Sequence, residues 1–412
     1  IFSDLSYSLS ESEASGFFST FGNIDSATYS AGQGIRKNLR SGGTLSFELS
    51  EGYDDVSYLT DSQSNTSATM RFNQPLLRGA FSKVATAEER KAILSHKGDM
   101  SNLAEVAIQS EQSVVEAYWS LVFALADLEV KQRSLDLAIS LRETTLAKIR
   151  VGAMAEVEVL QTEADIALRE EALLGAKNLV ENSTDALRRF LFNFEESDDW
   201  TVEFDLTSGL PAPSIFDGSW QDLWAEALES RGEFIKLKLQ IESAELDLLV
   251  AESNVLPKLD FTASGTYTSQ SEQIGDSLDL LLDRQFPGYT LGISFELPLG
   301  NKAFLGAKDQ AKYRLLLLQR QWRDRGSDLA QEVRAAVNNF NYQADRVELS
   351  ARTVLKAEKQ LEAEQRKLAQ GASTNYQVLQ FQSDLAVALS QRLQAQTEFA
   401  KAKAKIKTLQ GQ

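Results

Sequence analysis

The sequence predicts a mixed α and β fold in which two long helical hairpins, one in each half of the chain, follow segments of β-strand. Two observations support this class. The six prolines leave 76–210 and 299–412 free of proline, and an interior proline costs a helix about 3 kcal/mol. The two halves also align without a gap at a shift of 219 residues, the separation of Gly152 from Gly371. An ungapped internal match of this kind indicates duplication of one structural unit.

Composition narrows the classes of function before any motif is considered. The chain has 42 Lys and Arg against 59 Asp and Glu, and the net charge of −17 argues against nucleic acid as a partner. It has one histidine, His96, and no cysteine, so zinc clusters, cysteine nucleophiles and paired-histidine relays are excluded. We expect no enzymatic activity, no cofactor and no metal site. The residues after Ile1 show no basic region followed by an apolar run, so we expect any secretory leader to have been removed.

Alternation of apolar and polar residues predicts β-strands before each proline-free reach. The clearest run is 289–297, and 259–267 repeats the pattern. Weaker runs in the first half lie at 5–9, 29–39, 45–49 and 68–72, with a turn at 38–43. Tilted strands of about nine residues are long enough to cross a membrane. We therefore predict a lipid-facing surface made by Leu259, Phe261, Tyr289, Leu291, Ile293 and Phe295.

Strands with a lipid-facing surface would form part of a barrel wall, and one chain cannot complete such a wall. A sheet in lipid cannot keep an open edge, because each unpaired backbone group there costs several kcal/mol. Four to six strands do not close a barrel, so several copies must share one. Gln33 and Lys37 fall on the face of 29–39 that should be apolar, and a lysine facing lipid costs about 2–4 kcal/mol. We therefore expect the hairpin at 29–49 to lie outside the wall, which leaves four wall strands per copy.

Helical periodicity continues through both proline-free reaches. The first helix is expected at 80–151, about 108 Å long at 1.5 Å per residue, and Gly152 and Gly371 are expected at the hairpin tips. Gly98 and Gly326 lie inside the helices, where we expect bends or breaks. The predicted apolar seams are Val114, Ala117, Leu121, Leu125, Leu128, Leu135, Ile139, Leu146 and Ile149 in the first reach, and Leu329, Val333, Ala336, Phe340, Ala344, Val347, Ala351, Val354, Leu361 and Leu368 in the second.

These assignments divide the chain into five segments. Residues 1–75 form the first strand segment with extended loops, 76–193 the first long hairpin, and 194–256 a linker and helix that make a collar between the repeats. Residues 257–298 form the second strand pair and 299–412 the second long hairpin. Four lysines, two residues apart from Lys401 to Lys407, spread around a helix, so we expect them to be solvated.

Several short motifs occur in order along nearly the whole chain. They are Leu256-Pro257-Lys258-Leu259 before a strand pair, the runs from Gln74 to Gly79 and from Leu297 to Gly300 before the long helices, the paired Gly-then-Val-Leu tips, and Ala227-Leu228 with Arg231 and Glu233 between the repeats. No single motif is specific. Their order, which occurs twice, resembles that of the TolC-like outer-membrane efflux protein family.

The resemblance implies a homotrimer with a β-barrel in the outer membrane of a Gram-negative bacterium, in contact with its lipid, and a large helical tunnel in the periplasm. It implies a passive channel of a tripartite efflux or type I secretion system. A periplasmic adaptor protein would contact the hairpin tips, and an inner-membrane pump or ATPase would act through it. A trimer would have twelve wall strands, or eighteen if the 29–49 hairpin joined the wall. The implied adaptor contacts are Gly152, Ala153, Val159, Leu160, Gly371, Ala372, Val378 and Leu379.

The second hairpin departs from the family at its tip. Better-known relatives bear aspartates on either side of the Val-Leu pair, whereas this chain has Gln377 and Gln380. The first hairpin has Glu158 and Gln161 at the matching positions. We predict a periplasmic entrance constriction made by neutral amides and supplemented by Glu158.

A second class of function stays open. A soluble or peripheral coiled-coil scaffold of the cell envelope would also contain long helices, but it would tolerate charges at Leu291, Ile293 or Phe295. A periplasmic adaptor carries a helical hairpin too, although two hairpins in tandem argue against it. Nothing in the sequence selects among drugs, metal ions and secreted polypeptides as cargo.

Overall fold

The computed structural model describes residues 1–13, 23–56, 63–192, 200–271 and 286–411. The chain divides into two compact units. The first contains Ile1–Gly98 and Leu237–Gln321, and the second contains Asp99–Lys236 and Trp322–Gln412. The first holds the β-sheet together with helical residues 87–98, 237–255 and 302–321, and the second holds the rest of both hairpins and of the collar. The boundary predicted between 193 and 194 lies outside the described residues.

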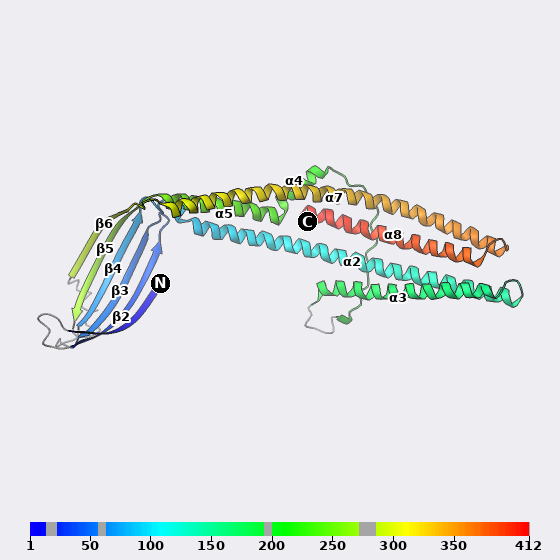
Figure 1. The fold of residues 1–412 in the computed structure, drawn as a ribbon, viewed down its shortest axis with the longest axis horizontal. Helices are drawn as coiled ribbons and strands as arrows, with labels where there is room; N and C mark the ends of the chain where they lie inside the picture. Colours follow the sequence, from blue (N-terminus) through cyan, green and yellow to red (C-terminus); the bar gives the residue numbers. More distant parts are fainter. Residues whose placement is uncertain (14–22, 57–62, 193–199, 272–285, 412) are drawn as a thin grey trace. The chain divides into compact units, whose positions relative to one another are not determined.

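The first unit contains one antiparallel sheet whose strands follow their order in the sequence (Figure 1). Its described strands are β1 (Phe2–Glu13), β2 (Asn23–Asn38), β3 (Thr44–Val56), β4 (Gln63–Pro75), β5 (Lys258–Ser271) and β6 (Phe286–Glu296). Each is longer than the predicted run of alternating residues, because Ser, Thr and Gly continue the strands beyond the apolar positions. The pairing of β4 with β5 joins the first half of the chain to the second.

The hairpin at 29–49 lies inside this sheet, so the expectation that it folds away from the other strands is wrong. β2 pairs with the whole of β1, and β3 pairs with β4 from Thr44 to Asp54. Lys37, which argued against this placement, is the penultimate residue of β2 and adjoins the turn at 39–43. A lysine at a strand end can extend its amine out of an apolar zone while its stem stays within it.

The helices of the two hairpins are long and continuous, and shorter helices precede the first hairpin and form the collar. The described helices are α1 (Ser82–Ala85), α2 (Ala87–Arg150), α3 (Val157–Leu191), α4 (Trp220–Ser230), α5 (Gly232–Val255), α7 (Lys302–Ala369) and α8 (Asn375–Leu409). The expected breaks at Gly98 and Gly326 are absent, since both residues lie within helices. Gly326 is buried, and its carbonyl accepts a hydrogen bond from Trp224 Nε1 at 3.0 Å. In the part of the chain that the structure describes, no helix is long and apolar enough to cross a membrane.

The second unit has its main core between α7, α8 and the collar helices. Phe234, Val333 and Phe399 are fully buried there, and Phe340 packs on Phe399 with ring centroids 5.0 Å apart. Most residues of the predicted α7 seam are buried, as the periodicity requires. The α2 seam is less uniform, because Leu125 is 37% exposed. Periodicity therefore found the buried face of α7 better than that of α2.

Candidate functional site: a two-faced sheet, two hairpin tips and an ion-pair cluster

One face of the sheet is apolar across all the described strands. The register places Tyr7, Tyr29 and Tyr53 in one row and Ile35, Phe47 and Met70 in another. The residues predicted to face lipid continue this face, since Leu259 lies opposite Phe295, Phe261 opposite Ile293, and Tyr289 and Leu291 follow on β6. Leu291 is 77% exposed and Tyr289 75% exposed in the single chain. This face presents large apolar side chains that the chain itself does not cover.

The opposite face is polar and rich in Ser, Thr and Gly. Hydroxyl groups meet across three strand pairs: Ser6 and Ser30 at 2.7 Å, Ser50 and Ser67 at 2.8 Å, and Thr69 and Thr266 at 3.2 Å. Asp4, Arg36, Glu48 and Arg71 also belong to this face by their register. One apolar and one polar face is the arrangement that the wall of a membrane β-barrel with a polar interior requires.

The two hairpin tips end their first helices in the same way. Gly152 has φ +74° and Gly371 has φ +75°. In the first tip Gly152 N–H donates to the carbonyl of Ile149 and Ala153 N–H to that of Lys148; in the second, Gly371 donates to Leu368 and Ala372 to Lys367. These paired bonds form a Schellman motif, which glycine at the left-handed position favours. The shift of 219 residues thus repeats the turn as well as the sequence.

The predicted tip residues fall into two groups. Gly152, Ala153, Gly371 and Ala372 are exposed, Leu160 is 65% exposed and Val159 is half-buried. Val378 and Leu379 are instead buried in a cluster with Leu135, Leu361 and Leu368. The prediction that these two side chains are surface contacts is therefore wrong, because both are core residues. The Val-Leu pair of α8 is thus buried, whereas Leu160 at the matching place in α3 stays exposed.

The predicted constriction residues lie beside the tips. Gln377, Gln380 and Gln161 are exposed and Glu158 is half-buried. Gln377 accepts a hydrogen bond from Ser373 Oγ at 2.9 Å, and Gln380 Nε2 donates to Asp384 Oδ1 at 3.0 Å. The four side chains come from the first turns of α3 and α8. Each chain thus presents three amides and one carboxylate beside the two tips.

Buried polar contacts connect the two hairpins behind the tips. Arg169 of α3 donates from Nη1 to the carbonyl and hydroxyl of Ser134 in α2, at 2.7 and 2.9 Å. Its Nη2 donates to the carbonyl of Leu379 in α8 at 3.3 Å, and Asn375 Nδ2 donates to Thr145 Oγ1 at 3.0 Å. Sequence reasoning missed Arg169, although an arginine at helical spacing between buried Ile166 and Leu173 was a usable signal.

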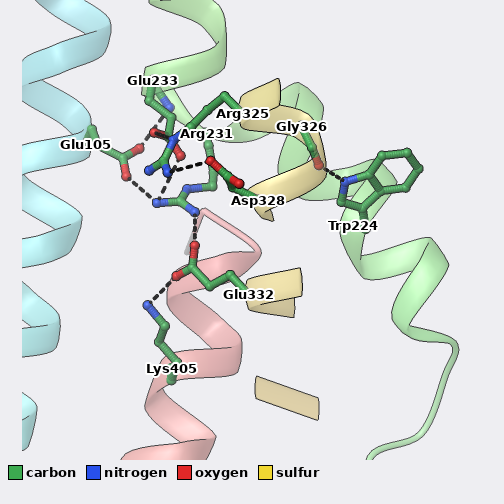
Figure 2. Close-up of polar contacts among 10 residues, drawn as sticks. Glu105, Trp224, Arg231, Glu233, Arg325, Gly326, Asp328, Glu332 and Lys405 are labelled. Carbon is green, nitrogen blue, oxygen red and sulfur yellow. Dashed lines mark hydrogen bonds and ion pairs between the residues drawn. The ribbon is translucent and has the colours of Figure 1, made fainter. Parts of the chain in front are cut away.

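A second polar cluster lies where the collar meets the hairpins (Figure 2). Arg231, which precedes α5, binds Glu105 of α2 at 3.1 Å, Glu332 of α7 at 3.1 Å and Glu233 at 3.3 Å. Glu332 also binds Lys405 of α8 at 2.8 Å. Four helices are thereby joined through two cations. The expectation that the terminal lysines are only solvated is wrong for Lys405.

The charges in this cluster stabilise one another. Burial alone would lower the pKa of the Arg231 guanidinium, but Glu233, Glu105 and Glu332 together raise that pKa above its ordinary value. Burial would raise the pKa of the Glu332 carboxyl, but Lys405 and Arg231 outweigh it and lower that pKa. Both side chains therefore stay charged at neutral pH, as ion pairs that fix helix positions require. In the described ranges no group of acidic and histidine side chains could hold a metal ion.

The sheet and the duplicated hairpins together define a class of fold, in which an antiparallel sheet with one apolar face is combined with two long helical hairpins. Residues 223–412 match the family model described as outer membrane efflux protein. Outer membrane protein TolC of Escherichia coli K12 is 23% identical over 346 residues, which cover 81% of this chain and 66% of the relative. TolC of Salmonella enteritidis is 22% identical with the same coverage. The chain thus spans slightly less than two thirds of the length of these relatives.

Solved structures have the same fold. The outer membrane protein VceC from Vibrio cholerae superposes with a TM-score of 0.70 at 16% identity, covering 94% of this chain and 87% of that one. The outer-membrane channel OprN superposes with a TM-score of 0.72 at 15% identity, covering 100% of this chain and 80% of that one. Residues 223–412 thus resemble the outer membrane efflux protein family, and the chain shares its fold with VceC and OprN.

Proposed function

We propose that three copies of this chain form a passive channel of a tripartite efflux or type I secretion system in the outer membrane of a Gram-negative bacterium. The strands cross the membrane, and the helical hairpins extend through the periplasm. One observation carries the proposal: the apolar face of the sheet is continuous across the strands, and its opposite face is polar. A soluble scaffold would leave this apolar face in water.

Exposure of the apolar face favours the membrane over the scaffold. Leu5 is 85% exposed and Ile293 71% exposed, and covering a side chain of this size is worth about 1.5–3 kcal/mol. Summed over the exposed apolar side chains of the described strands, the free energy gained by covering this face is large. The sheet still has two outer strands, β1 and β6, whose edges lipid cannot satisfy. Copies of the same chain can complete the wall, which favours an oligomer.

The exposed hairpin tips suit a protein partner. Gly152, Ala153, Gly371 and Ala372 offer a surface with small side chains, and Leu160 adds an apolar contact. We assign this surface to a periplasmic adaptor protein, through which an inner-membrane pump or ATPase supplies energy. The channel itself performs no chemical step and needs no cofactor in this scheme.

Matched charge substitutions on the two faces test the proposal. Leu291 lies on the apolar face and Thr290, its neighbour in β6, lies on the polar face. An arginine facing lipid at the midplane costs about 2–4 kcal/mol, so we expect Leu291→Arg to reduce outer-membrane insertion and Thr290→Arg to leave it unchanged. Membrane fractionation and native mass measurement of the detergent-extracted protein give the readout. A wild-type protein that stays monomeric in buffer without detergent would refute the proposal.

Single-channel recordings test the constriction. Gln377→Asp and Gln380→Asp would each add three carboxylates per trimer, so we expect both variants to raise cation selectivity. Asp384, which accepts from Gln380, provides a nearby control through Asp384→Asn. Unchanged selectivity in both glutamine variants would remove these residues from the pore mouth.

A further inference from the structure

We propose that the hairpin of β2 and β3 is part of the barrel wall and that β6 of each copy pairs with β1 of the next, so that three copies close a barrel of eighteen strands. This inference rests on the proposed function, because it assumes a trimeric channel. It adds what that function leaves open: the composition of the wall, the surface that binds the neighbouring copy and the width of the pore.

The hydrogen-bond ladder supports the inclusion of the hairpin. β2 pairs with β1 from Phe2 to Glu13, and β3 pairs with β2 from Thr44 to Val56. The ladder then continues from β3 to β4 as far as Asp54. If the hairpin lay outside the wall, the backbone hydrogen bonds between β1 and β2 and between β3 and β4 would be lost. In lipid every such unpaired backbone group costs several kcal/mol.

The faces of the hairpin match those of its neighbours. Tyr29 contacts Tyr7 with ring centroids 4.7 Å apart and lies 6.3 Å from Tyr53 by the same measure. On the opposite face, Ser30 contacts Ser6 and Ser50 contacts Ser67. Both faces therefore continue through the hairpin, and Gln33, Lys37 and Glu51 are among the polar residues on its apolar face. A hairpin that left the wall would carry its apolar face into water.

The two outer strands fit a second copy of this chain. The sheet has an even number of described strands that alternate in direction, so β6 runs antiparallel to β1. A rotated copy can therefore place its β1 beside β6 in the antiparallel arrangement used throughout the sheet. The apolar positions are odd-numbered in both strands, at Leu5 and Tyr7 and at Tyr289 and Leu291. Pairing odd positions with odd positions keeps lipid and lumen faces continuous across the subunit boundary.

The additional hairpin widens the channel. Strands lie about 4.8 Å apart and tilt by about 40°, so each takes roughly 6.3 Å of the barrel circumference. Eighteen strands then give a backbone diameter of about 36 Å, against about 24 Å for twelve. The cross-section differs about 2.25-fold. We infer that the outer-membrane segment admits bulkier cargo than a barrel with four strands per copy would.

Cysteine cross-linking tests the wall in the native membrane, because the chain has no cysteine of its own. Ser50→Cys with Ser67→Cys should form a disulfide within each copy if β3 is in the wall. Leu5→Cys combined in turn with Tyr289→Cys, Leu291→Cys or Ile293→Cys should link copies into dimers and trimers in at least one combination. Leu5→Cys with Thr290→Cys places the thiols on opposite faces and should give none.

A deletion and a direct count complete the test. Deleting 23–56 joins β1 to β4, which are already antiparallel, and should give a narrower barrel that excludes smaller polyethylene glycols added from the outer side. Electron cryomicroscopy of the wild-type complex should show eighteen strands. A trimer in the membrane with twelve strands, or without the Ser50–Ser67 cross-link, would overturn this inference alone. A monomer, or a protein that does not insert, would overturn the proposed function as well.

Discussion

Replacing the tip glycine Gly152 by alanine should weaken the first hairpin tip by about 1 kcal/mol. The residue has φ +74°, and a Cβ built on it meets no atom within 4 Å, so the cost is in the backbone and not in a clash. Placing an L-residue with a side chain in this region costs about 1–2 kcal/mol. Alanine returns about 0.4–1 kcal/mol by restricting the unfolded chain. The same reasoning applies to Gly371, at φ +75° and equally open.

Amide hydrogen exchange measured by mass spectrometry provides the assay, because opening of the tip is local. The Gly152 and Ala153 amides, hydrogen-bonded to Ile149 and Lys148, should exchange about fivefold faster in Gly152→Ala, the ratio that corresponds to about 1 kcal/mol. Gly175→Ala is the matched control, since Gly175 lies inside α3 with equally open space. That variant should stabilise the helix by about 1 kcal/mol. Unchanged tip exchange in Gly152→Ala, or faster exchange in Gly175→Ala, would refute the reasoning.

Three further predictions concern the buried polar clusters. Arg231→Ala should destabilise the second unit by about 3 kcal/mol in thermal or denaturant unfolding, because it removes the cation that Glu105, Glu233 and Glu332 share. The exposed Arg323→Ala should change stability by less than about 0.5 kcal/mol. Glu332 has a pKa lowered from 4.5, so its stabilising effect is complete above that pH and is lost as the pH falls through the lowered pKa; Glu332→Gln should therefore reduce the acid sensitivity of unfolding. Arg169→Met should accelerate exchange in the first turns of α8, and unchanged exchange there would show that the arginine does not connect the hairpins.

The hairpins could be predicted because their signals are local. A glycine that ends a helix, the absence of proline and a repeated spacing are all visible within one segment. The structure ends α2 at Arg150 and α7 at Ala369, immediately before the two tips. The strands were predicted for the same reason, since alternation needs only neighbouring residues.

The failures arose where the answer depends on a distant partner. Arg231 lies 126 residues from Glu105 and 101 from Glu332, and nothing in either local sequence indicates that they meet. Lys37 appeared unfavourable in a membrane strand because its distance from the strand end was unknown before the register. The burial of Val378 depends on which helix covers α8, and the periodicity of α8 itself does not contain that information.

The second helices of the two repeats, α3 and α8, have equal lengths of 35 residues but differ in which side chains they expose. This difference has a structural consequence. Arg169 of α3 corresponds at the 219-residue shift to Ala388 of α8, and both are buried. Alanine has no side-chain donor, so only Arg169 can donate to another helix. It bonds the carbonyl of Leu379 in α8, and Ala388 of α8 makes no equivalent bond to α3. The two hairpins of a copy are thereby held together, while Leu160 stays 65% exposed on the other repeat. A ring built from a few duplicated subunits needs this asymmetry. One side of each hairpin must be fixed to the other hairpin of the same copy, and the other side must remain available to a neighbouring copy or an adaptor.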